Sequence, residues 1–249
     1  MKRLLQVFLL AILVSNFVNA QTAKPVYVIV HGAWGGGWAF KKVDSLMGEK
    51  GCIVYRPTLT GQGEKVHLAT TSVGLDTHIN DVVNTILFED LHDIILIGHS
   101  YGGMVVTGVA DSLPARIRKL IYLDAMVPEN GESVLSIQGA RADRLKQMVS
   151  DGFVIPPWVT AGKLAPKDVP HPYKTLTDSI VLKNKLREKI STSYILTVAK
   201  GIEAKDDDFA MHAERAKKKA WPVLQMEADH NPQWSAPEAL VEMFLKAAK

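Results

Sequence analysis

Residues 94–112 read IILIGHSYGGMVVTGVADS, and the interpretation of the chain starts from this stretch. Four apolar residues end at Gly98, and the residues after Ser100 alternate between small and apolar, as in a packed helix. Between them, Gly98 to Gly102 fits the pattern G-x-S-x-G, which requires a strand before it and a helix after it. Glycines two residues on either side of Ser100 allow a sharp turn without a clash. The pattern therefore predicts that Ser100 is a nucleophile raised into a cleft.

Short apolar runs elsewhere in the chain predict the remaining strands. They are continuous and rich in branched residues, as in parallel strands that are buried on both faces. Helical patterns alternate with them at about residues 38–49, 75–88, 101–112 and 236–248. We therefore predict an α/β fold, with a mostly parallel sheet of about six strands and helices on both faces. The predicted strands are Val26–Val30, Cys52–Tyr55, Ile94–Ile97, Leu120–Leu123, Tyr194–Val198 and Pro222–Met226.

The regular alternation lapses at about residues 127–191, a proline-rich stretch with helical patterns near 138–149 and 178–190. A compact domain rarely contains so long an irregular segment unless the segment serves a function. Because ligands bind at the carboxyl ends of the strands in such sheets, we expect this insertion to form a small cap there. The alternative is a set of extra helices packed on one side of the sheet.

Residues 1–20 have the pattern of an export signal, and residues 21–249 are predicted to form the α/β domain. Lys2-Arg3 is a positive start, an apolar stretch follows, and Val18-Asn19-Ala20 supplies small residues before a cut ahead of Gln21. We therefore predict a periplasmic or secreted protein that is not stably inserted in a membrane after cleavage. An uncleaved N-terminal anchor is the alternative.

Composition excludes several classes of protein. Of the 249 residues, 47% are hydrophobic and 22% are charged, a balance typical of globular domains. The net charge of +3 falls to +1 without Lys2 and Arg3, so we expect no nucleic-acid partner. The chain has no clustered metal ligands and no nucleotide-binding loop, so we expect neither a metal nor a cofactor. The single cysteine, Cys52, is expected in the core.

Ser100 needs a base to accept its proton, and His230 is the best placed of the eight histidines. It follows an apolar strand and precedes the last helix, which matches the chain order of serine, acid and histidine. His171 lies between prolines in the cap segment and is a candidate for substrate contact. A surface position is expected for the histidines in polar sequence, which are His67, His78, His92 and His212.

The carboxylate that orients the histidine has two candidate positions. Asp124 follows a predicted strand and therefore faces the same edge of the sheet as Ser100. A buried carboxylate at that position needs a compensating partner. The alternative is the acidic group after the penultimate strand, part of which also resembles the start of a helix. That group comprises Glu203, Asp206, Asp207 and Asp208.

Reaction at a carbonyl also requires amide donors for the developing oxyanion. One donor is the N–H of Tyr101, directly after the nucleophile, and the other is expected in the loop after the first strand. We assign the second donor to Ala33, with Trp34 as the alternative. Aromatic and apolar residues of the cleft and cap are expected to line the substrate pocket. The pocket residues predicted are Trp34, Trp38, Met126, Trp158 and His171.

The mature chain resembles the α/β-hydrolase superfamily at the stretches VIVHGAWGGGW, LIGHSYGGMVV, LIYLDAMVPENGES and ADHNPQW. It is most similar to plant methylesterases and hydroxynitrile lyases and their bacterial esterase relatives. The resemblance implies Ser100 and His230 as catalytic residues, with the amides of Ala33 and Tyr101 as the oxyanion hole. Bacterial members carry the same Leu-Asp-Ala-x-Val-Pro segment and lack an acid after the penultimate strand, which favours Asp124.

We therefore expect a serine carboxylesterase that cleaves small to medium apolar esters through an acyl-enzyme intermediate. One alternative is a ligand-binding or receptor-like member of the superfamily with little turnover. The other is a hydroxynitrile lyase. The lyases carry His-Thr after the first strand and a lysine after the catalytic histidine, whereas this chain has His31-Gly32 and His230-Asn231.

Overall fold

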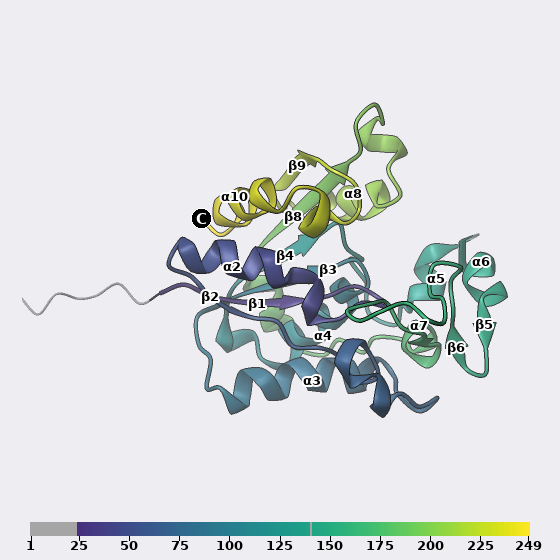
Figure 1. The fold of residues 1–249 in the computed structure, drawn as a ribbon. Helices are drawn as coiled ribbons and strands as arrows, with labels where there is room; N and C mark the ends of the chain where they lie inside the picture. Colours follow the sequence, from purple (N-terminus) through teal and green to yellow (C-terminus); the bar gives the residue numbers. More distant parts are fainter. Residues whose placement is uncertain (1–23, 140) are drawn as a thin grey trace, which may run out of the picture.

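Six parallel strands form the central sheet of the protein, in the order β2-β1-β3-β4-β8-β9 (Figure 1). The computed structural model describes residues 24–139 and 141–249, so the predicted export signal lies outside the described residues. Each strand matches one of the predicted apolar runs, and the α/β class is confirmed. The strands are β1 (Val26–Val30), β2 (Ile53–Tyr55), β3 (Ile94–His99), β4 (Ile117–Leu123), β8 (Ser191–Val198) and β9 (Val223–Glu227).

Strand β3 lies between β1 and β4, and every one of its residues is buried. Gly98, near its end, pairs with Val30 of β1 on one side and with Tyr122 of β4 on the other. The three strands run in the same direction, so their carboxyl ends meet at one edge of the sheet. The loops that follow them lie side by side there, where open α/β sheets bind ligands.

Helices cover both faces of the sheet (Figure 1). The larger apolar core contains residues of α3, α4 and α8, and a second core on the other face contains residues of α2 and α10. Cys52 is buried in the second core, as predicted. No helix among the described residues is long and apolar enough to span a bilayer. The helices are α2 (Lys41–Glu49), α3 (Leu75–Phe88), α4 (Gly102–Ser112), α8 (Ala210–Lys218), α9 (Pro232–Ser235) and α10 (Pro237–Ala247), with short turns η1 (Gly37–Phe40), η2 (Gly63–Leu68), η3 (Pro114–Arg116) and η5 (Ala204–Asp206).

The insertion between β4 and β8 contains its own antiparallel sheet, in the order β5-β6-β7, which the sequence did not predict. Figure 1 shows α5, α6, β5 and β6 beyond the end of the main sheet rather than on one of its faces. Trp158 and Asp168 from this insertion line the same cavity as Ser100, so it acts as a cap. Its elements are α5 (Val134–Gln138), α6 (Arg141–Gln147), β5 (Val149–Ser150), β6 (Phe153–Val154), β7 (His171–Pro172), α7 (Lys174–Thr177) and η4 (Lys185–Lys189).

The helix predicted at residues 178–190 is wrong, because only the short turn η4 forms there. The backbone before that turn bonds to side chains of other elements instead of to its own carbonyls. Leu182 N–H donates to Asn130 Oδ1, and Asn184 N–H donates to Asp111 Oδ1. These bonds use the donors that a continuous helix would need for its own ladder.

Candidate active site

Ser100 occupies a sharp turn between β3 and α4, with a backbone φ of 55°. This left-handed conformation is costly for a residue with a side chain and requires support from its surroundings. The flanking glycines explain how the turn fits. A Cβ on Gly98 would lie 2.6 Å from Val106 Cγ2, and one on Gly102 would lie 2.7 Å from the Val30 carbonyl oxygen. Only glycine therefore allows α4 to approach the sheet closely enough to form this turn.

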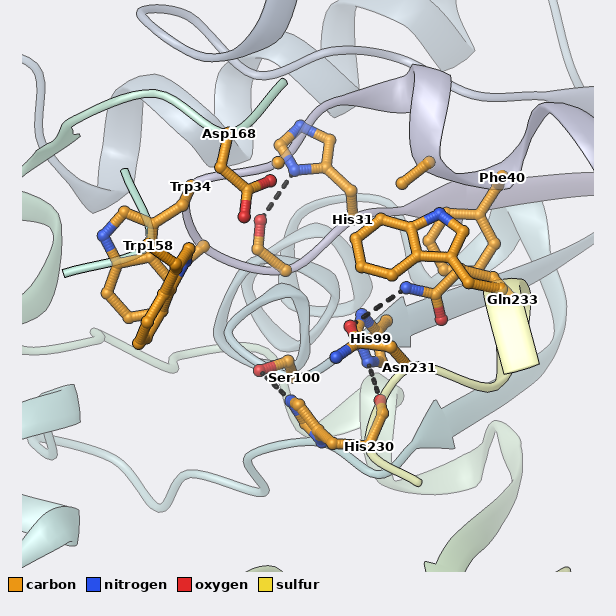
Figure 2. A pocket seen from close by; sticks show the side chains of 15 residues that line it. His31, Trp34, Phe40, His99, Ser100, Trp158, Asp168, His230, Asn231 and Gln233 are labelled. Carbon is orange, nitrogen blue, oxygen red and sulfur yellow. Dashed lines mark hydrogen bonds between the residues drawn. The ribbon is translucent and has the colours of Figure 1, made fainter. Parts of the chain in front are cut away.

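A chain of hydrogen bonds links Ser100, His230 and Asp124, the three residues singled out in the sequence. His230 Nε2 lies 3.0 Å from Ser100 Oγ, and His230 Nδ1 lies 2.6 Å from Asp124 Oδ2 (Figure 2 shows the first contact). The other carboxylate oxygen, Oδ1, accepts from the Thr197 N–H at 3.2 Å. A proton on Nδ1, donated to Asp124, leaves Nε2 free to accept the Ser100 proton.

Asp124 is only 1% exposed and follows the last residue of β4. None of the alternative carboxylates forms a hydrogen bond with His230 in the described structure. Asp207 Oδ1 accepts from the Phe209 N–H, and Asp208 pairs with Arg141 at 2.7 Å. Asp206 ends the turn η5, and Glu203 precedes it. Among the described residues, Asp124 is therefore the carboxylate hydrogen-bonded to His230, while the Phe209 ring stacks on the imidazole at 4.6 Å.

Of the two predicted oxyanion donors, Tyr101 directly follows the nucleophile, and Ala33 lines the same cavity as Ser100. Tyr101 stands directly before α4, where free backbone N–H groups and the helix dipole favour negative charge. Within the described parts of the chain, neither the Ala33 nor the Tyr101 N–H donates to another protein group. The Trp34 N–H, the alternative donor, points to His171 Nδ1 at 3.3 Å. The geometry therefore favours Ala33 over Trp34.

Ser100 and His230 open onto a cavity of about 250 Å³ between the sheet edge and the cap (Figure 2). Trp34 and Trp158 line it as predicted, with their rings edge to face at 5.5 Å. Several other residues of the lining are not predicted from the sequence. The cavity is lined by His31, Gly32, Ala33, Trp34, Gly35, Ala39, Phe40, His99, Ser100, Trp158, Asp168, His230, Asn231, Gln233 and Trp234.

Three predicted pocket residues, Trp38, Met126 and His171, are not part of this lining. Trp38 stacks on Trp234 at 5.8 Å. Met126 is buried in the larger core beneath the nucleophile, where its N–H donates to the Ser100 carbonyl at 3.1 Å. His171 is fully buried against Thr175 and Gln62. None of the three side chains therefore lines this cavity: Met126 and His171 are buried, and Trp38 packs on another tryptophan.

The cap holds the loop that carries the Ala33 amide through the neighbouring residue, Trp34. The Trp34 carbonyl accepts from the Val169 N–H at 2.9 Å, and the Trp34 indole donates to the Val154 carbonyl at 3.1 Å. Together with the contact from the Trp34 N–H to His171, these bonds hold Trp34 at a φ of 65°. Such a conformation persists only when several contacts fix it. The position of Ala33 therefore depends on the cap.

Five histidines other than His230 are buried, and burial lowers their pKa values. The pKa of His99 falls to about 3, and that of His31 falls to about 4. Burial therefore keeps both neutral at pH 7; His99 Nε2 donates to the His230 carbonyl, and His31 Nε2 accepts from the Leu59 N–H. The expected surface positions of His78 and His212 are wrong, since these side chains are 0% and 2% exposed. Their pKa values are also lowered, to about 4.

We expect these histidines to make the protein unstable in mild acid. In the unfolded chain each histidine has its ordinary pKa of 6.5, whereas in the folded protein its pKa is about 3 to 4. The protein therefore has its full stability above pH 6.5, where these histidines are neutral in both states. Below pH 6.5 each histidine reduces the free energy of unfolding by about 1.4 kcal/mol per pH unit. Urea unfolding between pH 8 and pH 5 measures this loss.

Replacing one buried histidine tests whether these side chains cause the loss of stability in acid. His212 Nδ1 accepts from the Val127 N–H, and an asparagine Oδ1 can take that place. His212→Asn should flatten the decline below pH 6.5 by about 1.4 kcal/mol per pH unit. His67→Gln, which changes an exposed histidine, should leave the slope unchanged. A slope for His212→Asn equal to that of the wild type would contradict the assignment.

Comparison with known proteins gives relatives over most of the chain. The sequence model of the alpha/beta hydrolase family matches residues 27–243. The carbendazim hydrolyzing esterase of Nocardioides sp. (strain SG-4G) is 50% identical over 111 residues, which cover 45% of this chain and 46% of that protein. The pFDCC methylesterase MES16 of Arabidopsis thaliana is 27% identical over 90% of this chain and 95% of its own. The structure of an extracellular alpha/beta-hydrolase from a Paenibacillus species matches with a TM-score of 0.76 and 24% identity, covering 90% and 98% of the two chains.

Proposed function

The chain belongs to the alpha/beta hydrolase family, and on that premise we propose that it is a serine carboxylesterase that cleaves small to medium apolar esters through an acyl-enzyme intermediate. The observation that carries this proposal is the hydrogen-bond chain from Asp124 through His230 to Ser100. Similar proteins named as esterases support the same class of reaction.

The first half of the reaction acylates the enzyme. His230 Nε2 accepts the Ser100 proton while Ser100 Oγ attacks the ester carbonyl carbon, and Asp124 stabilises the imidazolium that forms. The N–H groups of Ala33 and Tyr101 donate to the developing oxyanion. When the tetrahedral intermediate collapses, His230 gives its proton to the leaving alkoxide, and the alcohol departs.

Water completes the reaction by the same proton route. His230 takes a proton from water as the water oxygen attacks the acyl carbon, and returns it to Ser100 Oγ as the carboxylic acid leaves. No step of this sequence requires a cofactor. The cavity of about 250 Å³ supports small to medium substrates, because it lies just below the range of about 300–1,000 Å³ that is usual for ligand pockets.

A lyase reaction is the weaker candidate. A Cβ at Gly32, where the lyases carry threonine, would lie 3.0 Å from Ser100 Cβ, so the wall beside the nucleophile fits a residue without a side chain. Asn231 also lacks the positive charge of the lysine that follows the catalytic histidine in lyases. Its side chain instead accepts from the Gln233 amide at 3.1 Å.

Labelling with a reactive phosphonate tests the proposal. We expect wild-type protein to hydrolyse p-nitrophenyl esters of short and medium acyl chains, and the phosphonate to abolish this turnover with one adduct per chain. Peptide mass spectrometry should place the adduct on Ser100, because its hydroxyl is the group activated by a base. Full turnover after stoichiometric labelling, or an adduct on another residue, would contradict the assignment.

We also propose that the protein is exported, as a periplasmic or secreted enzyme. Support comes from the leader pattern of residues 1–20, with Lys2-Arg3 before an apolar stretch and small residues before the cut. The intact mass recorded in the labelling experiment reports the N-terminus as well. A chain that is recovered outside the cytoplasm should begin at Gln21, whereas a retained leader would contradict cleavage.

A further inference from the structure

One carboxylate, Asp168, lies in the wall of the cavity that contains Ser100. It belongs to the cap segment between β6 and β7 and is partly buried. Figure 2 shows its side chain beside Trp34 and Trp158, on the side of the cavity opposite Phe40 and Gln233. The reaction described above gives this carboxylate no role.

Asp168 forms no salt bridge with another described residue. Burial raises its pKa, against smaller lowering effects from Lys163 and the Trp158 side chain. The other ionisable groups of the lining are three histidines, of which His31 and His99 are neutral at pH 7 because burial lowers their pKa values. With His230 in its neutral, proton-accepting state, Asp168 supplies the one formal charge of the described lining.

A partly buried carboxylate that forms no salt bridge is costly, and a ligand cation would offset that cost. Indole rings attract a cation placed over their faces, and two such rings stand next to this carboxylate. An anionic group would meet repulsion in the same place. The cavity therefore combines apolar walls for most of a substrate with one position that favours positive charge.

We propose, building on the esterase function above, that Asp168 is a specificity-determining residue that recognises a positively charged nitrogen group of the ester, with Trp34 and Trp158 packed around that group. The substrate class is then an ester with apolar bulk and one cationic nitrogen. The competing role for Asp168 is to hold Trp158 in place. Asp168→Asn separates the two roles, because it removes the charge and keeps an oxygen acceptor.

The test uses p-nitrophenyl esters whose acyl chains end in trimethylammonium, tert-butyl or carboxylate groups, and acetate esters of choline and its tert-butyl isostere. Trimethylammonium and tert-butyl groups share a shape and differ in charge. In the wild type, we expect kcat/KM to rank cationic above neutral above anionic in at least one series. Asp168→Asn should reduce the cationic-to-neutral ratio by roughly tenfold or more, the effect of one close charge pair.

The control is Asp143→Asn, which removes a negative charge from the exposed cap helix α6 without altering the cavity lining. It should leave the cationic-to-neutral ratio at its wild-type value. An equal loss for cationic and neutral esters in Asp168→Asn, or an unchanged ratio in both series, would overturn the proposal while leaving the esterase function intact. Wild-type protein that hydrolyses none of the esters, whether cationic, neutral or anionic, would instead refute the esterase function, and the specificity proposal with it.

Discussion

Ser100→Ala is expected to reduce kcat for ester hydrolysis by roughly a million-fold, the loss seen when a serine hydrolase is deprived of its nucleophile. The hydroxyl is the only group of Ser100 that this change removes. Alanine keeps the Cβ that serine already places at a φ of 55°, so the turn gains no strain. Steady-state turnover of a p-nitrophenyl ester measures the loss, and thermal unfolding checks that the fold is retained.

Ser112→Ala provides a matched control. Ser112 ends α4, the helix that begins just after Ser100, and its hydroxyl donates only to the Gly108 carbonyl. This variant should retain wild-type turnover. If Ser100→Ala retained turnover comparable to that of Ser112→Ala, the hydroxyl of Ser100 would not be the nucleophile, and the reaction proposed here would be wrong.

The sheet and the nucleophile turn are predictable because local sequence determines them. Strand β3 is buried on both faces, so it requires a continuous apolar run, and Gly98 and Gly102 stand at fixed positions of the pattern G-x-S-x-G. The cap is different. Its strands β5, β6 and β7 each contain only two residues, too few to produce a periodic pattern. The pairing of β7 with β6 also joins segments that are separated by the irregular residues 155–170.

The sequence allows two positions for the acid, because sequence order does not give distances between loops. Strands β4 and β8 are neighbours, with Leu123 paired to Ile195, so the loops after both lie close to the histidine loop. The geometry distinguishes them, because only Asp124 projects from its strand end to Nδ1 of His230. Asp124 also has a left-handed backbone, with a φ of 42°.

The residues that line the pocket are harder to predict than the sheet, because composition does not determine where a side chain points. Trp34 lies in the loop after β1 and Trp38 in the turn η1 that follows it, yet only Trp34 lines the cavity. Asp168 stands alone in a segment with no periodicity, so nothing in the sequence marked it. The burial of His78 did leave a signal. It lies three residues after Leu75 and four before Val82, on the buried face of α3.

Asp124→Asn is expected to lower kcat by roughly ten-thousand-fold, because asparagine cannot stabilise the imidazolium. Its amide group would also donate to Nδ1, which moves the histidine proton to Nε2, where the Ser100 proton must be received. The fold should survive, since asparagine tolerates a positive φ and its oxygen still accepts from the Thr197 N–H. Turnover measured beside a thermal unfolding curve separates lost catalysis from lost structure.

Asp207→Asn is the matched control, because Asp207 is an alternative candidate for the acid and interacts electrostatically with both Asp124 and His230. Its partial burial raises its pKa, and both Asp124 and His230 contribute to that pKa through their charges. Its Oδ1 caps the Phe209 N–H, a bond that an asparagine oxygen preserves. Asp207→Asn should therefore change kcat by less than about tenfold, since it removes only a screened charge from the surroundings of His230. If this variant lost more activity than Asp124→Asn, the acid would lie after β8, and the hydrogen bond from His230 Nδ1 to Asp124 would not be the one used in catalysis.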